Sequence, residues 1–164
     1  MSIEVREATP DEYDEAGRVT SDSYRELVRT GEDDWSAYLD TIADIAARAG
    51  RTTVLVAVEA GRILGSATLE LDGRTEPESE PLPSREAHIR MLGVSADTRR
   101  RGVAKMLMAA CEDRARAAGR TRMTLNTTSR MAAAQLMYES LGYEREPDRV
   151  FPDGFVLLSY AKRL

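Results

Sequence analysis

The sequence predicts a mixed α/β fold (α+β in its arrangement), in which helices cover the faces of one mixed central sheet. Apolar residues recur with the period of a strand in some segments and with that of a helix in others, in the order β-α-α-β-β-β-α-β-α-β-β. Strands that follow one another directly alternate with strand–helix–strand units, so the sheet is not uniformly parallel. The length of 164 residues predicts one domain over residues 1–164.

The chain is expected to begin with a strand and a helix. Residues 3–8 alternate apolar and polar side chains, as a half-buried strand does. Thr9 and Pro10 then supply an N-cap and a first-turn proline for a helix over residues 11–28.

A second helix and a hairpin are predicted next. The helix extends from Asp33 or Asp34 to Gly50, a residue type that often ends helices. Residues 52–71 form two β-rich runs on either side of Ala60-Gly61, which is typical of a hairpin.

The middle of the chain combines a loop, a strand and a helix. Residues 72–85 are polar, contain three prolines and lack periodicity, so a mobile loop is expected. Residues 86–94 form the next strand, and a helix over 103–118 ends at Gly119. The apolar face of this helix is expected to comprise Val103, Met106, Leu107, Ala110 and Cys111.

The last third of the chain is predicted to return to the sheet. Residues 122–126 form a short strand, and the helix that follows within residues 131–143 ends at Gly142. An irregular or β segment over 144–151 leads to a last strand over 155–164.

The composition excludes several classes of protein. Apolar residues make up 42% and charged residues 31%, and no apolar run approaches the roughly 18 residues that a membrane span needs. The acidic start lacks the apolar middle of a signal peptide, so a cytoplasmic protein is expected. One cysteine and one histidine argue against a disulfide or a metal site, and Cys111 is interpreted as a buried thiol.

Charge is distributed unevenly around a net value of −5. Residues 1–80 carry 8 basic and 19 acidic side chains, whereas residues 99–130 carry 9 basic and 2 acidic ones. This distribution argues against nucleic-acid binding and is compatible with an anionic ligand held centrally beside a cationic one. Solvated helix faces are an equally simple interpretation.

The stretch TRRRGVAKML over residues 98–107 is the main candidate for a phosphate site. A strand that leads through a short loop into a helix directs free backbone N–H groups and the helix dipole to one point. Gly102 permits close approach of a ligand, and the arginines and Lys105 add positive charge. The stretch lacks the sequence of a P-loop or of a dinucleotide-binding loop.

Residues 86–143 resemble the GNAT N-acetyltransferase superfamily, whose hallmark is [QR]-x-x-G-x-[GA] between a strand and a helix. Arg99, Gly102 and Ala104 occupy its fixed positions. A second motif, A-x-x-x-Y-x-x-x-G-[FY], is matched by Ala134, Tyr138, Gly142 and Tyr143.

The resemblance implies that acetyl-CoA binds where the strands 86–94 and 122–126 splay apart. Its pantetheine arm is then expected to pair with the free edge of Leu92, Gly93 and Val94, and the Val94 N–H to point at the thioester oxygen. Where the family often has asparagine this chain has Met131, and Asn126 is the candidate replacement. The phosphates would be bound by Arg99, Arg100, Arg101, Gly102, Val103, Ala104 and Lys105.

Tyr138 and His88 are the candidate catalytic residues. Tyr138 matches the family's general acid, and the alternative is a tyrosine that only packs. His88, on the same side of its strand as Glu86 and Arg90 if no bulge intervenes, is the candidate base, and Glu86, Glu70 and solvent remain open.

Three aromatic residues, Tyr24, Trp35 and Tyr38, are expected to pack in the core, although the resemblance assigns their region to the wall of the acceptor site.

The function predicted by the resemblance is N-acetyl transfer from acetyl-CoA, without a metal, to a primary amine of a small molecule or peptide by direct attack. The acidic first half favours a cationic acceptor, and the family's frequent dimers leave a homodimer open. The alternatives are a non-catalytic acyl-CoA sensor and an anion or nucleic-acid binding protein.

Overall fold

A computed structural model describes residues 2–27, 35–129 and 131–164. In these parts of the chain, seven strands form one sheet in the order β1-β2-β3-β4-β5-β7-β6, in which β4 and β5 are parallel and the other neighbours are antiparallel. The strands are β1 (Glu4–Glu7), β2 (Thr53–Glu59), β3 (Arg62–Glu70), β4 (Glu86–Val94), β5 (Arg122–Thr127), β6 (Glu144–Val150) and β7 (Val156–Arg163). The helices are α1 (Tyr13–Arg25), α2 (Ser36–Ala43), α3 (Ile45–Ala49), α4 (Val103–Ala117) and α5 (Ala132–Ser140), with short 3-10 turns at Pro10–Glu12 and Ala96–Thr98. The predicted mixed fold and its element order are confirmed.

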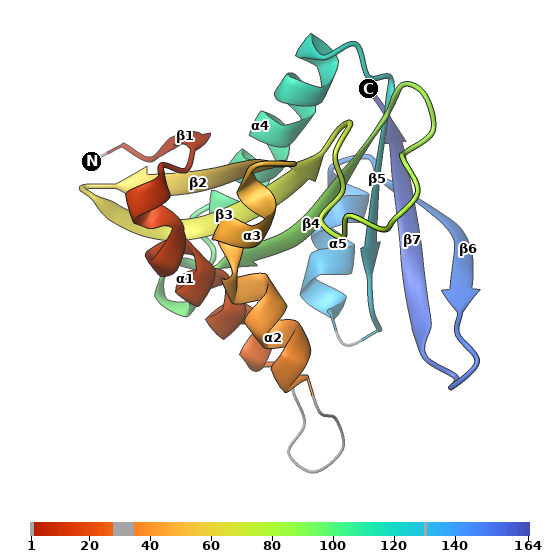
Figure 1. The fold of residues 1–164 in the computed structure, drawn as a ribbon, viewed down its shortest axis with the longest axis horizontal. Coiled ribbons are helices and arrows are strands. Elements are labelled where there is room, and N and C mark those ends of the chain that lie inside the picture. The colour runs from red at the N-terminus through yellow and green to blue at the C-terminus, as the bar shows by residue number, and fades with distance from the viewer. Residues whose placement is uncertain (1, 28–34, 130) are drawn as a thin grey trace.

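Helices cover both faces of the sheet: α1, α2 and α3 lie on one side, and α4 and α5 on the other (Figure 1). The alternation along β2 shows why, because Val54 and Val56 pack in one cluster with Ile45 of α3, whereas Leu55 and Ala57 pack with α4. A strand buried on both faces has no polar side, which explains the continuous apolar run of β2.

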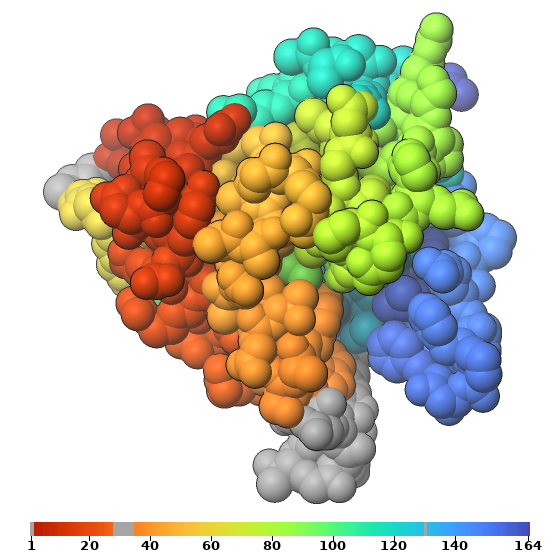
Figure 2. Space-filling model, in the orientation of Figure 1, coloured from red at the N-terminus to blue at the C-terminus, as the bar shows by residue number. Residues whose placement is uncertain are grey.

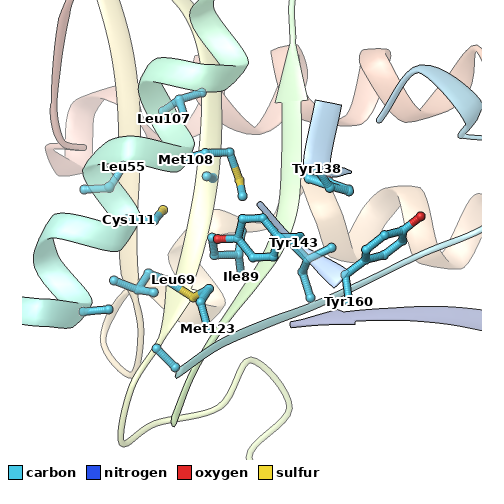
Figure 3. Close-up of a cluster of buried hydrophobic side chains, with 14 of the residues drawn as sticks. Leu55, Leu69, Ile89, Leu107, Met108, Cys111, Met123, Tyr138, Tyr143 and Tyr160 are labelled. Atoms are coloured by element: carbon cyan, nitrogen blue, oxygen red, sulfur yellow. The ribbon is translucent and has the colours of Figure 1, made fainter. Parts of the chain in front are cut away.

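The larger core cluster joins α4, the sheet and α5. Figure 3 shows Leu107, Met108 and Cys111 of α4 facing the sheet, with Tyr138 and Tyr160 at the opposite end of the cluster and Tyr143 between them and α4. Cys111 is fully buried, and burial raises the pKa of its thiol to about 12. The expectation of a buried thiol is therefore confirmed.

The sheet separates between β4 and β5. The parallel pairing joins residues 86–89 to residues 122–125 and then stops. Beyond this point β4 remains paired to β3, with an extra residue on β4 between Arg90 and Gly93 and a left-handed Met91 (φ +55°). The expected divergence of these two strands is confirmed, and it leaves one edge of β4 unpaired.

Two helices differ from the predictions in detail. The predicted helix start at Asp33 or Asp34 lies outside the described residues. Within residues 35–50 the predicted single helix is two helices, because Asp44 leaves the helical conformation and its carboxylate accepts a hydrogen bond from the Ala47 N–H. In α4, Met108 and Glu112 are buried while Met106 is only half-buried. Glu112 tolerates burial because its carboxylate accepts hydrogen bonds from Tyr143 (2.8 Å) and Lys162 (2.9 Å).

Within the described parts of the chain, no helix has the length and apolar character required to cross a bilayer.

Candidate active site

A cavity of about 490 Å³ opens where β4 leaves β5. Residues 88–91 form one wall and residues 126–128 the other, and the 72–85 loop and the β6–β7 segment contribute to the rim. On the face drawn in Figure 2, a recess separates the orange α2 from the blue β6 and β7. The break in sheet pairing is thus the structural origin of the cavity.

Aromatic side chains cover the α1–α2 side of the cavity. Trp35 packs edge-on against Tyr38 and Tyr38 against Tyr24, with ring centroids 6.2 and 6.4 Å apart. All three line the cavity, and Tyr24 and Trp35 also contact a small core cluster. Core packing was expected for all three. Tyr24 and Trp35 combine core packing with a place in the cavity wall, whereas the expectation is wrong for Tyr38, which is 38% exposed.

The 72–85 loop is irregular, as predicted, and is tied to the protein at several points. Glu70 is fully buried and accepts hydrogen bonds from the Thr75 N–H (2.6 Å) and Arg74 Nε (2.8 Å). Arg51 donates to the main-chain carbonyl of Thr75, and Arg90 pairs with Glu76. These contacts hold the loop against the cavity.

His88 lies in the cavity wall and is nearly buried. Its Nδ1 is 2.7 Å from Thr124 Oγ1, whose own hydroxyl donates to the carbonyl of Ala87 (3.3 Å). This arrangement is compatible with a proton on Nδ1 and a free lone pair on Nε2. The pKa of His88 is lowered to about 4, chiefly by burial; Glu70 and Glu76 oppose the shift, and Arg74 and Arg90 contribute to it. His88 is therefore neutral at pH 7.

The alternative bases lie less favourably. No bulge intervenes between Glu86 and Arg90, but Glu86 is outside the cavity wall and pairs with Arg122 (2.9 Å). Burial acts to raise the pKa of Glu70, yet the hydrogen bonds from Thr75 and Arg74 outweigh it and hold this pKa below its usual value. Glu70 is thus a paired structural anion.

Tyr138 projects from α5 and is only 5% exposed. Its ring lies 6.1 Å from that of Tyr143 and 6.0 Å from that of Tyr160, and no described residue is hydrogen-bonded to its hydroxyl. Burial raises the pKa of Tyr138 to about 12. The buried Tyr24 of the cavity wall has a pKa raised first by burial and then by Tyr38 and Tyr138.

The arginine stretch forms a tight turn before α4. Arg100 (φ +69°) and Gly102 (φ +80°) are left-handed, and nothing lies within 4 Å of a Cβ added at Gly102. The glycine is required here by the backbone conformation, since the space beside it is open. Arg99 and Arg101 form ion pairs with Glu26 and Glu59.

The remaining candidate residues lie on the two separated strands. Leu92 lies in the bulge of β4 and Gly93 and Val94 follow it, where β4 is paired with β3 but no longer with β5. Gly93 packs so closely on α1 that a Cβ would lie 2.3 Å from Ser23 Oγ. Asn126 lines the cavity and accepts a hydrogen bond from Ser159 (3.1 Å).

The sequence analysis missed three cavity arginines, Arg74, Arg90 and Arg149, as part of a site. Only Arg90 could have been found from the sequence, because it lies two residues after His88 and therefore on the same side of the strand.

Residues 15–143 match the acetyltransferase (GNAT) family. No curated protein matched the chain. Among solved structures, a GNAT-family acetyltransferase from Staphylococcus aureus superposes with a TM-score of 0.74 at 16% identity, covering 99% of both chains. The ribosomal-protein-S18-alanine N-acetyltransferase from Escherichia coli has a TM-score of 0.70 at 18% identity and covers 99% of this chain and 94% of its own.

An acetyltransferase from Salmonella typhimurium, described as putative and solved with its cofactor acetyl-CoA, has a TM-score of 0.69 at 20% identity and covers 100% of this chain and 95% of its own. At these identities the structures support the fold, and the family match extends over most of the chain. The chain belongs to the GNAT family of acetyltransferases.

Proposed function

We propose that this protein transfers the acetyl group of acetyl-CoA to a primary amine of a small molecule or peptide by direct attack in a ternary complex. The observation that carries the proposal is the divergence of β4 from β5 after the Ile89–Leu125 pair, directly above the cavity. A single domain over residues 1–164 would contain the whole site.

The residues at the divergence fit acetyl-CoA. The unpaired edge of Leu92–Val94 offers backbone groups to an extended amide-containing arm. The first intrahelical bond recorded at the start of α4 joins the Met106 N–H to the Gly102 carbonyl, so the N–H groups of residues 103–105 are free for phosphate oxygens. Arg100 and Lys105 would add positive charge there. Arg99 and Arg101 would do so by leaving their carboxylate partners, Glu26 and Glu59, and binding phosphate oxygens instead.

Acetyl-CoA supplies the activated acyl group, and the residues of the chain organise its transfer. The Val94 N–H would stabilise charge on the carbonyl oxygen as the amine attacks. Tyr138 holds its proton at neutral pH and is suited to protonate the departing thiolate. His88 is neutral and would accept the proton of the amine directly or through water, although its pKa of about 4 makes it a weak base.

The proposal is tested by following free thiol release from acetyl-CoA with a panel of amines, alongside the melting temperature with and without acetyl-CoA. Turnover with at least one amine and a higher melting temperature are expected. Stabilisation without turnover of any amine would indicate an acyl-CoA sensor. No stabilisation by acetyl-CoA, together with binding of nucleic acid, would indicate an anion-binding protein.

A further inference from the structure

The described residues around the cavity carry more positive than negative charge. Arg74, Arg90 and Arg149 line it, whereas Glu76 is the only carboxylate residue of the described chain in its wall. Of the acidic side chains that the structure describes in residues 2–27 and 35–80, only Glu76 therefore lines this surface. The expectation that the acidic first half favours a cationic acceptor is not supported by where these described side chains lie; Glu32, Asp33 and Asp34 are outside the described residues.

Arg90 is the most enclosed of these arginines. Its side chain is 19% exposed and projects from β4 immediately before the bulge. Burial acts to lower its pKa, but Tyr38 and Glu76 beside it outweigh burial and raise the pKa. Because a guanidinium has five N–H donors in a fixed fork, these two partners occupy only part of it.

Glu76 also shows which chemical group suits this position. Its carboxylate pairs with Nη1 of Arg90 inside the cavity wall. A carboxylate therefore fits against this guanidinium, and the remaining donors can bind a second one.

Arg149 supplies an additional positive charge. No described carboxylate lies within ion-pair distance of it, and its guanidinium stacks on the ring of Phe151 at 5.3 Å. Arg74, in contrast, is neutralised by the buried Glu70. Arg90 is likewise paired with Glu76, so Arg149 is the lining arginine whose charge no described carboxylate offsets, and a ligand carboxylate would meet this charge together with the unoccupied N–H donors of Arg90.

We propose that the acceptor is an amine that also carries a carboxylate, which binds to Arg90 and Arg149, while its apolar part packs on Tyr24, Trp35 and Tyr38. The inference rests on the proposed acetyl transfer and specifies its substrate class. A polycationic acceptor would bring like charges together around Arg90 and Arg149, an arrangement that costs free energy where water is partly excluded.

The test compares acceptors that differ in charge. L-phenylalanine, its carboxamide, phenethylamine and spermidine are assayed by thiol release from acetyl-CoA. L-phenylalanine is expected to have a kcat/KM about 10- to 100-fold higher than that of the carboxamide, because its carboxylate forms charge-assisted hydrogen bonds with the arginines. The carboxamide has the larger fraction of neutral amine at neutral pH, so a preference for the acid cannot arise from a shortage of neutral amine in the carboxamide.

Variants then locate the effect. Arg149→Gln removes a charge that has no ion pair within the described chain, and Arg90→Gln removes the enclosed one. Each is expected to reduce the preference for the carboxylate by about tenfold or more, chiefly through KM. Arg18→Gln, at an exposed position of α1 outside the cavity, is the matched control and should leave the preference unchanged.

Three outcomes are separable. Faster turnover of spermidine or the carboxamide than of the acid would overturn the inference and leave the proposed acetyl transfer intact. A preference for the acid that survives in Arg149→Gln would overturn the assigned site, and this variant serves even if Arg90→Gln does not fold. Absence of thiol release with every amine would count against the proposed function itself.

Discussion

At the scale of single residues, Tyr138 combines features that a proton donor needs. It is buried at the end of the large core cluster, its hydroxyl has no described hydrogen-bond partner, and burial raises its pKa to about 12, which keeps it protonated at neutral pH. The neighbouring tyrosines differ, because Tyr143 donates to Glu112 and Tyr160 donates to Glu139. Tyr138 therefore has a hydroxyl free for a ligand, which supports its proposed role as general acid.

Tyr138→Phe is expected to lower kcat by about 10²- to 10⁴-fold, the usual contribution of a general acid, while the Kd for acetyl-CoA changes little because the ring still packs. The measurement is steady-state kinetics together with cofactor titration. Tyr13→Phe, which removes a phenol oxygen from the opposite face of the sheet, is the control and should retain full activity. A decrease in kcat of less than about threefold would assign Tyr138 to packing alone.

At the scale of elements, the order of strands and helices could be predicted because periodicity is a local property. The break at Asp44 could not be predicted in this way. A capping side chain inside a segment of helical periodicity competes with continuation of the helix, and the tertiary contacts of α2 and α3 decide the outcome. The cavity arginines Arg74, Arg90 and Arg149 come from a loop and two strands that are far apart in the sequence. Their convergence depends on sheet order, which local patterns do not specify.

Gly102 should be needed in the turn before α4 because of its left-handed backbone conformation, since a side chain at this position would have room. Gly102→Val forces a β-branched residue to φ +80°, which costs about 1–2 kcal/mol and distorts the N–H groups of the first turn of α4. Acetyl-CoA binding should weaken measurably in isothermal titration. Gly61→Val, at φ +78° in the β2–β3 hairpin and equally open, should lose similar stability yet bind acetyl-CoA as the parent does. Equal affinities in both variants would contradict the proposed phosphate site.

The position of α2 depends on Arg48, which is 2% exposed. Its guanidinium donates to the carbonyls of Thr41 (2.9 Å) and Ile42 (3.0 Å) at the end of α2 and to Thr68 Oγ1 (3.0 Å) in β3. Arg48→Met keeps the aliphatic stem and leaves these acceptors without a donor, so the free energy of unfolding should decrease by about 2 kcal/mol or more. Urea denaturation measures this change, with Arg116→Met on the exposed side of α4 as the control.

At the scale of the whole molecule, the response to acid reports on the cavity because the chain contains one histidine. A histidine in the unfolded chain binds a proton near pH 6.5, whereas the folded His88 does so only near pH 4. Between these values the unfolded state binds more protons than the folded state, so stability falls as the pH falls. The stability is fully present above pH 6.5 and is lost progressively down to about pH 4.

Because of His88, the free energy of unfolding of the parent should decrease by about 3 kcal/mol between pH 6.5 and 4. This decrease should be absent in His88→Gln. Urea denaturation at several pH values measures it in both proteins, and the ring resonances of His88 should not titrate above about pH 5 in the folded parent. Carboxylates with lowered pKa values, such as Glu12 at about 2, destabilise both proteins alike below about pH 4.5 and serve as the internal control. An equal slope in parent and variant above pH 4.5 would show that His88 titrates normally in the folded state. The cavity would then be far more hydrated than its enclosed wall of Tyr24, Arg90 and Met91 indicates.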